Sequence, residues 1–228
     1  MSTKLGINEI FGPTFQGEGK SFGMPCAFLR LAGCGLACVW CDTKYTWDWN
    51  NYDPKKEIHP TELDDAYNQI VKIGTKNLVI SGGEPLLQQK HLLPLALRLR
   101  NNGWWIEIET AGVIIPIDYE IADQFNVSPK LINSGNSLKK RYKPEALRSF
   151  AESKKSIFKF VVSNIDDFEE IDTLVNGFRM KPVYIMPEGV SAENIATGLK
   201  NIAAETVARQ YNLTTRLHVE LYGNRRGI

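Results

Sequence analysis

Short runs of apolar, β-branched and aromatic residues alternate with longer segments of helical periodicity along most of this chain. Strands are expected at residues 26–31, 77–81, 104–110, 125–127, 157–162, 183–186 and 217–221, and helices at 61–73, 88–102, 144–152, 166–176 and 191–211. This alternation is typical of βα units, which place parallel strands side by side in one sheet. About six parallel strands are too few for a closed barrel of eight, so we predict an α/β fold with a partial, open TIM-like barrel.

The charge balance and length restrict the class of protein. The 228 residues include 27 Lys and Arg against 26 Asp and Glu, for a formal net charge of +1. Because the charges balance so closely, the protein has no bulk attraction to nucleic acid or to an anionic membrane, although a local basic patch remains possible. Residues 1–6 lack the apolar run of a signal peptide, and no stretch approaches the ~20 apolar residues of a membrane span. We predict a cytoplasmic protein with one domain over residues 1–228.

Three of the four cysteines lie close together, as Cys34, Cys38 and Cys41, in the spacing C-x3-C-x2-C. The loops between them are too short for easy bridging, and soft thiolates at close spacing suit an iron–sulfur cluster or zinc. Electron-transfer clusters ordinarily use four thiolates, and structural zinc is normally closed by four Cys or His ligands. Three thiolates leave one metal position open, and an open position is where chemistry takes place.

The fourth cysteine, Cys26, opens the strand expected at 26–31. Cys26 and Arg30 would share one face of that strand, about 13 Å apart along it. A thiol so far from the strand's end has trouble reaching a metal on the loop, so we expect Cys26 to be buried and inert. A zinc site completed by a distant histidine stays open as an alternative, although no histidine has a ligand-like spacing to the loop.

The strand expected at 104–110 alternates in polarity. Ile106 and Ile108 share one face with Trp104, while Glu107 and Glu109 lie on the other face. Two carboxylates on one face predict a polar barrel interior, with the apolar face beneath the helices. An edge strand with one solvent-exposed face is the alternative.

The segment after the cysteine loop carries two local predictions. Residues 44–59 are expected to be irregular, and Thr61 is expected to cap the helix that follows.

Polar and glycine-rich motifs follow successive strands. Residues 82–85, Gly-Gly-Glu-Pro, come directly after the apolar strand 77–81, and the glycines let backbone approach a ligand closely. The Glu84 carboxylate could accept hydrogen bonds from an ammonium group. Residues 109–112 close the next strand, and residues 128–130 close the one after. Each motif alone is more often a simple turn, but in series at strand ends they favour a binding site.

The cysteine loop, with Trp40 just before its third cysteine, resembles the signature loop of radical S-adenosylmethionine (SAM) enzymes. The Gly-Gly-Glu motif at 82–84 is similar to the motif that holds the amino group of SAM in that superfamily. Residues 9–19 form a glycine-rich run with Gln and Glu, which can wrap a polar heterocycle. This run, the cysteine spacing and Cys41-Asp42-Thr43 together resemble one family, the 7-carboxy-7-deazaguanine synthases. The resemblance covers residues 9–130 and the closing 225–228, and is loose over 131–183.

The resemblance implies a radical SAM-type partial barrel and a carbon–nitrogen lyase of queuosine biosynthesis. Its cofactors would be a [4Fe-4S] cluster on three cysteines, SAM chelating the fourth iron, and Mg²⁺. A 5′-deoxyadenosyl radical would take a hydrogen from 6-carboxy-5,6,7,8-tetrahydropterin, and ring contraction with loss of ammonia would give 7-carboxy-7-deazaguanine. An electron-donor protein such as a flavodoxin or ferredoxin, and a homodimer, are also implied.

The resemblance assigns roles to individual residues of this sequence. The cluster ligands would be Cys34, Cys38 and Cys41, with Thr43 on Mg²⁺. SAM contacts would be Trp40, Asp42, Gly83, Glu84, Gly112, Ser128, Pro129 and Lys130. Substrate contacts would be Phe15, Gln16, Gly17, Arg30 and Thr110. Residues 1–25 would form the N-terminal substrate loop region and 34–43 the cluster loop, with no catalytic residue beyond these ligands. Some family members have a longer insert between the first two cysteines, and residues 44–60 do not match the family.

Two other functions stay open at this point. A radical SAM activase, which installs a glycyl radical on a partner protein, shares the cysteine loop but has no need of the 15–19 loop. A non-enzymatic module that binds zinc through its thiolates is the second, and it would be colourless.

Overall fold

The strands of the computed structural model, which describes residues 4–228, join one nine-stranded sheet in the order β3-β1-β2-β4-β5-β6-β7-β8-β9. The strands are β1 (Lys4–Phe15), β2 (Pro25–Leu31), β3 (His59–Glu62), β4 (Asn77–Gly82), β5 (Trp105–Thr110), β6 (Gln124–Val127), β7 (Ser156–Val162), β8 (Val183–Pro187) and β9 (Asn212–Leu213). Each neighbouring pair in the series β2, β4, β5, β6, β7, β8 and β9 is parallel. β1 pairs antiparallel with β2 on one side and with β3 on the other. Because the sheet begins at β3 and ends at β9, the barrel is open, which confirms the predicted fold.

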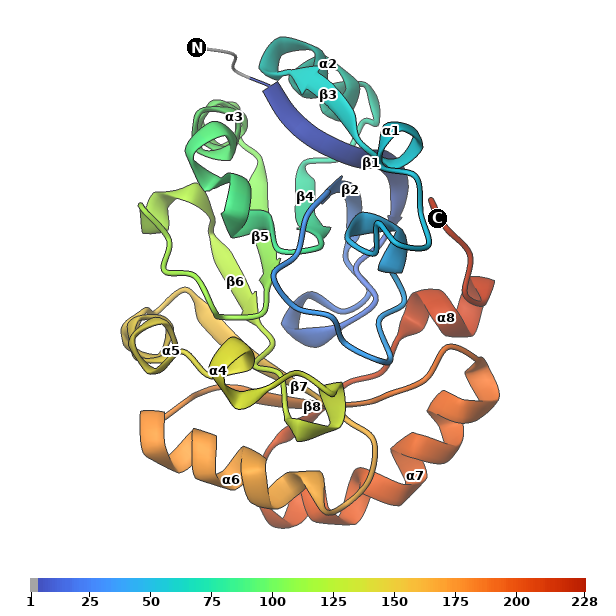
Figure 1. Ribbon diagram of the computed structural model, residues 1–228, viewed down its shortest axis with the longest axis vertical. Coiled ribbons are helices and arrows are strands. Elements are labelled where there is room, and N and C mark those ends of the chain that lie inside the picture. Colours follow the sequence, from blue (N-terminus) through green and yellow to red (C-terminus); the bar gives the residue numbers. More distant parts are fainter. Residues whose placement is uncertain (1–3) are drawn as a thin grey trace.

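Helices lie around the outside of this curved sheet, as Figure 1 shows. They are α1 (Pro54–Glu57), α2 (Leu63–Lys72), α3 (Gln89–Asn101), α4 (Leu138–Arg141), α5 (Pro144–Glu152), α6 (Asp167–Phe178), α7 (Ala192–Ala208) and α8 (Leu217–Tyr222). Every helix among the described residues is too short or too polar to cross a membrane. Residues Met1–Thr3 lie outside the described residues. They belong to the predicted domain and to the N-terminal stretch that was expected to hold no signal peptide.

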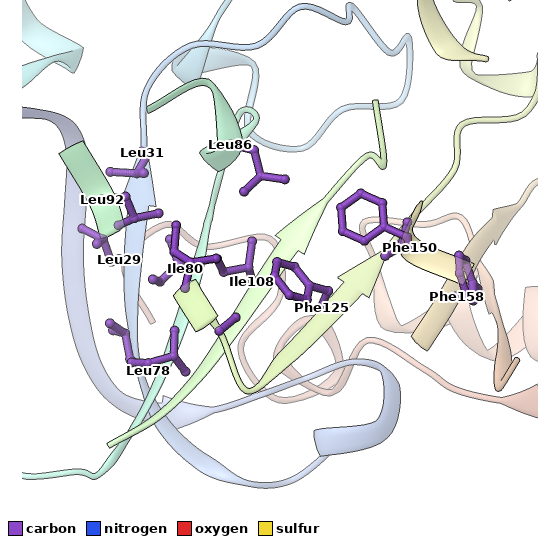
Figure 2. Close-up of a cluster of buried hydrophobic side chains, with 14 of the residues drawn as sticks. Leu29, Leu31, Leu78, Ile80, Leu86, Leu92, Ile108, Phe125, Phe150 and Phe158 are labelled. Atoms are coloured by element: carbon purple, nitrogen blue, oxygen red, sulfur yellow. The ribbon is translucent and has the colours of Figure 1, made fainter. Parts of the chain in front are cut away.

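The core lies between the strands and the helices. Figure 2 shows Ile80, Ile108 and Phe125 on neighbouring strands, with Leu92 of α3 and Phe150 of α5 nearby. All five are fully buried, and the rings of Phe125 and Phe150 meet edge-on at 5.5 Å between centroids. The polar side chains of β5 face the opposite way, into the barrel. Since β5 lies between β4 and β6, the polar interior is confirmed and the edge-strand alternative is wrong.

Six predicted strands are confirmed as β2 and β4–β8, but the seventh, at 217–221, is wrong because these residues form helix α8. The alternating apolar residues mimic a strand, yet only Val219 is buried and Leu221 is 52% exposed. Thr61 does not cap α2 either. It lies in β3 and its hydroxyl donates to the His59 carbonyl, while Glu62 occupies the N-cap without a side-chain cap.

The N-terminal run is a strand rather than a loop. β1 extends through Phe15, so the expected loop over residues 9–19 is confined to the residues after it. The register against β2 shifts between Phe11 and Thr14, around Gly12-Pro13. A bulge of this kind accommodates glycine and proline within a strand, which explains why the sequence pattern did not predict a strand here. The expected irregular stretch 44–59 is largely confirmed, with short helical turns at Lys44–Thr46 and Pro54–Glu57.

Candidate active site

A cavity of about 240 Å³ lies at the carboxyl ends of the parallel strands. Most of the residues predicted for the site line it together: Phe15, Gln16, Arg30, Cys34, Cys38, Trp40, Cys41, Asp42, Thr43, Gly83, Thr110, Ser128 and Lys130. Gly17, Glu84, Gly112 and Pro129 do not line it. Parallel strands converge at one edge of the barrel, which is why residues distant in sequence meet here.

The three thiols of the cluster loop share this cavity, and all are free of disulfides. Each sulfur accepts a hydrogen bond from an N–H group of the chain. The donors are Leu36 N to Cys34 Sγ at 3.4 Å, Asn136 Nδ2 to Cys38 Sγ at 3.2 Å and Trp47 Nε1 to Cys41 Sγ at 3.3 Å. Burial raises the pKa of Cys34 to about 11 and also raises the pKa of Cys38. A metal bound to these thiols would lower their pKa again, since a thiol binds metal in its deprotonated form.

This donor set fits an iron–sulfur cluster. Hydrogen bonds to the sulfurs are a principal means by which proteins tune such clusters. Among residues 4–228, no group of three or more His, Cys, Asp or Glu side chains is arranged so that it could hold a metal ion as the side chains stand. The three thiols line the same cavity, and Lys130 lies on its wall.

Glycine is required where the Gly-Gly-Glu motif meets the cluster loop. A Cβ on Gly83 would lie 2.1 Å from the Gly33 carbonyl oxygen, and the Glu84 N–H donates to that same oxygen at 2.8 Å. Gly82 has φ +132°, and its Cβ would lie 2.0 Å from the Leu31 carbonyl oxygen. These glycines therefore serve to pack two loops against each other, as well as to line the cavity.

Glu84 is only 1% exposed, and its carboxylate points toward the end of β5 rather than into the cavity. It accepts hydrogen bonds from the Thr110 hydroxyl and the Ala111 N–H, both at 2.9 Å, and from Leu86 N–H at 3.1 Å. Burial raises the pKa of this carboxyl, and the hydrogen bonds oppose that rise. Glu84 thus fixes the position of Thr110, which does line the cavity.

The other predicted residues that do not line the cavity include two glycines at close contacts. Gly112 has φ +71°, and a Cβ there would lie 2.7 Å from Val127 Cγ1. A Cβ on Gly17 would lie 2.3 Å from Nδ1 of His218, which lines the cavity. A Cβ at either position would force the neighbouring side chain to shift, and the positive φ of Gly112 favours glycine further.

A network of alternating charges crosses the cavity wall, with Lys159 and Arg216 buried and their carboxylate partners partly buried, and sequence patterns did not indicate it. Lys159 of β7 donates to Glu18 at 2.5 Å and to Glu109 at 2.8 Å. Arg216 donates to Glu18 at 3.1 Å and forms an ion pair with Asp42. Burial opposes the ionisation of Glu18, but Lys159 and Arg216 hold its pKa well below the usual range. Buried charges persist only when paired in this way, so the network fixes the cluster loop to the barrel wall.

Beneath this network, Glu107 is fully buried at the centre of a polar cluster. Its carboxylate accepts hydrogen bonds from Gln16, Asn126, Ser21 and Gln124. Burial, assisted by the neighbouring Glu109, raises the pKa of Glu107 to about 7. The amide of Gln16 also donates to Glu109 at 3.0 Å, so both carboxylates orient a residue predicted to contact substrate.

The Glu107→Gln variant tests this shift through stability. A carboxyl whose folded pKa lies above its unfolded value of ~4.3 stabilises the fold below that pH, and the contribution is lost as the pH rises through about 7. In wild type the free energy of unfolding should fall as the pH rises from 5 to 8, and in Glu107→Gln this fall should be smaller by about 1–3 kcal/mol. Urea unfolding across this range measures it, with exposed Glu145→Gln as the control. Parallel curves for Glu107→Gln and wild type would show that another group titrates.

Comparison with known proteins agrees with this geometry. A model of the Radical SAM superfamily matches residues 29–170, which include the cluster loop and the strand-end motifs. The matched residues hold the three thiols of the cavity and the parallel strands β4–β7. The chain therefore belongs to the radical SAM superfamily.

Within that superfamily, the similarity extends over whole chains. The 7-carboxy-7-deazaguanine synthase of Pyrobaculum aerophilum is 38% identical over 98% of this chain and 97% of its own length. That of Rhodopirellula baltica is 32% identical, over 99% of this chain and 89% of its own. The crystal structure of QueE from Escherichia coli superposes with a TM-score of 0.72 at 28% identity, covering 94% of this chain and 95% of that one. The chain is a member of the 7-carboxy-7-deazaguanine synthase family.

Proposed function

We propose that this chain is a carbon–nitrogen lyase that converts 6-carboxy-5,6,7,8-tetrahydropterin to 7-carboxy-7-deazaguanine and ammonia. The observation that carries this proposal is a single cavity that combines three thiols on one loop with Arg30, Gln16 and Thr110. A [4Fe-4S] cluster and SAM supply, when bound, the 5′-deoxyadenosyl radical that starts the reaction. The relatives that match the full length favour neither a glycyl-radical activase nor a non-enzymatic thiolate module.

At the cofactor end, we assign the cluster to Cys34, Cys38 and Cys41. Around it, SAM would contact Trp40, Asp42, Gly83, Ser128 and Lys130. The ammonium of Lys130 lies 5.4 Å from the centre of the Trp40 ring and donates to the Ser128 hydroxyl at 2.8 Å, so these three side chains support one another. Glu84, Gly112 and Pro129 would support this wall from behind, Glu84 through its hydrogen bonds to the end of β5.

At the substrate end, Arg30 donates through Nε to Glu9 at 2.6 Å. Among residues 4–228, no group hydrogen-bonds to its two terminal nitrogens, which suits a guanidinium that forks onto a substrate carboxylate. Gln16 is held at both ends of its amide, because it donates to Glu109 and accepts from Glu18 N–H at 3.3 Å. Phe15 and Thr110, which line the cavity, complete the proposed substrate contacts, and Gly17 would support them from behind, next to His218.

We place Mg²⁺ at Thr43, which lines the cavity and whose hydroxyl lies 3.6 Å from Cys41 Sγ. A hard cation that keeps several waters and binds one protein oxygen plus a substrate carboxylate is ordinary magnesium chemistry. We expect Thr43→Ala to raise the Mg²⁺ concentration for half-maximal activity about tenfold, and Thr43→Ser to restore it. A Mg²⁺ titration of product formation measures this. Superimposable titration curves for Thr43→Ala and wild type would remove Thr43 from the site.

We further propose a cytoplasmic enzyme with one domain over residues 1–228, a homodimer, and no nucleic-acid or membrane partner. An electron-donor protein such as a flavodoxin or ferredoxin would reduce the cluster. The exposure of the loop between Cys38 and Cys41 supports an external electron donor. Val39 in this loop is 62% exposed, so a donor protein that docks there would lie close to the thiols.

The proposal is tested by incubating anaerobically reconstituted protein with SAM, Mg²⁺, a reductant and 6-carboxytetrahydropterin. We expect mass spectrometry to detect a product lighter than the pterin by the mass of ammonia. Formation of 5′-deoxyadenosine without any deazaguanine would contradict the substrate. If a glycyl-radical protein were activated instead, the alternative radical SAM function would hold.

A further inference from the structure

The C-terminal segment, residues 214–228, closes one side of the cavity. Arg216, His218 and Ile228 line it, and the Leu217 N–H donates to the Gly17 carbonyl at 3.0 Å. Figure 1 shows this red segment running from α8 back toward α1, on the N-terminal side of the barrel. The C-terminal segment therefore lies against the predicted N-terminal substrate loop region, at Asn8, Glu9 and Gly17.

One side chain fastens the last part of this segment. Arg226 Nη2 lies 3.0 Å from Asn8 Oδ1 and 2.8 Å from Glu57 Oε2, and its Nε lies 3.3 Å from Glu9 Oε2. Its guanidinium also lies 4.1 Å from the centre of the Tyr45 ring. Within residues 4–228, these are all the hydrogen bonds and ion pairs that join 223–228 to residues before α8.

The contacts are individually modest but mutually supporting. The Arg226 side chain is 41% exposed, so a single ion pair there would contribute little. Glu9 and Glu57 are only 15% exposed, however, and the partners come from β1, α1 and the turn at Lys44–Thr46. A planar guanidinium that stacks on a ring while donating to several acceptors is a role that lysine cannot reproduce.

Glu9 connects this fastening to the substrate end of the cavity. One carboxylate oxygen accepts from Arg30 at 2.6 Å and from the Tyr45 hydroxyl at 3.4 Å, while the other faces Arg226. Arg30 and Arg226 thus share one carboxylate. If Arg226 withdrew, Glu9 would be free to turn both oxygens toward Arg30 and compete for the terminal nitrogens.

We propose that Arg226 is a positioning residue that clasps the C-terminal segment over the substrate end and, through Glu9, keeps Arg30 available to an anionic substrate. This inference rests on the proposed function for the identity of that substrate. Arg226 does not itself line the cavity, so it acts through Arg30 and through the placement of Ile228. The clasp and the substrate carboxylate stabilise the same arrangement, so binding at one favours the other.

The test compares Arg226→Ala with Arg225→Ala in the reconstituted holoenzyme. Arg225 is the exposed neighbour, and within residues 4–228 its side chain makes no hydrogen bond or ion pair. For Arg226→Ala we expect KM for 6-carboxytetrahydropterin to rise about tenfold with kcat changed less than about threefold. Amide hydrogen exchange in residues 217–228 should quicken, and the pterin should protect this segment less than in wild type. Arg225→Ala should match wild type, and Arg226→Lys should fall between.

Unchanged exchange and an unchanged KM would overturn the clasp, and so would a loss confined to kcat. Glu57→Gln provides a second variant, since it weakens the clasp from the α1 side without touching the cavity, and it should also quicken exchange in 217–228. Exchange without pterin reports the clasp whatever the substrate is. If wild type made no deazaguanine but Arg226→Ala still loosened the segment, the proposed function would fail and the clasp would stand.

Discussion

Cys38→Ala is expected to lose the iron–sulfur cluster and to reduce product formation more than about 1000-fold, because the cluster loop supplies only three thiolates. Cys38 is 8% exposed, and its sulfur is held by a hydrogen bond from Asn136, so the variant removes a thiol that the fold keeps in place. Iron and sulfide analysis, with absorbance near ~400 nm after anaerobic reconstitution, measures the loss.

The matched control is Cys26→Ala. Cys26 is fully buried in β2 and does not line the cavity, and burial raises its pKa to about 12. This agrees with the buried, inert thiol expected from the sequence. We expect Cys26→Ala to keep full iron content at some cost in stability. A brown Cys38→Ala protein with unchanged iron would contradict the assignment of the cluster to this loop.

Arg30→Ala is expected to raise KM for the carboxylated pterin about 100-fold, the equivalent of roughly 2–3 kcal/mol for a charge-assisted pair. The Arg30 side chain is 14% exposed, and Glu9 orients it from behind. Arg30→Lys should recover only part of the loss, because an ammonium cannot fork onto a carboxylate. Steady-state kinetics with the carboxylated pterin, and with a pterin that lacks the carboxylate, measure the effect.

The control for Arg30 is Arg98→Ala on α3, which removes an arginine from an exposed ion pair with Asp64. It should leave KM unchanged. Unaltered kinetics for Arg30→Ala would remove this residue from the substrate site, and an equal loss on both pterins would show that it does not bind the carboxylate. Because Arg30 and Arg226 share Glu9, their KM effects should not be additive in the double variant.

The parallel strands could be predicted because the sheet buries them on both faces. All seven residues of β7 are buried, and such a strand appears in the sequence as a continuous apolar run. β1 escaped prediction because Gly12 and Pro13 sit at a bulge within it, where strand propensity fails. Helix α8 was mistaken for a strand because its few apolar positions alternate, and six residues are too few to show helical periodicity.

The candidate site divides in the same way. Its glycines and cysteines could be predicted because they lie on short loops whose spacing is visible in the sequence. The charged network could not, since Lys159 and Glu18 are 141 residues apart and meet only when the barrel curves. The one local signal was a lysine within the apolar run of β7, since a buried lysine requires a partner. Glu84 shows the reverse case, because a recognisable motif residue turns its carboxylate to the neighbouring strand end.

The most direct test of the proposed reaction is its stoichiometry under anaerobic turnover with excess pterin and limiting SAM. We expect ammonia and 7-carboxy-7-deazaguanine to form in equal amounts, and to exceed the SAM supplied, because SAM is expected to act as a regenerated cofactor. Accumulation of 5′-deoxyadenosine in proportion to SAM, with neither ammonia nor deazaguanine released, would contradict the lyase and leave only a radical SAM enzyme of another substrate.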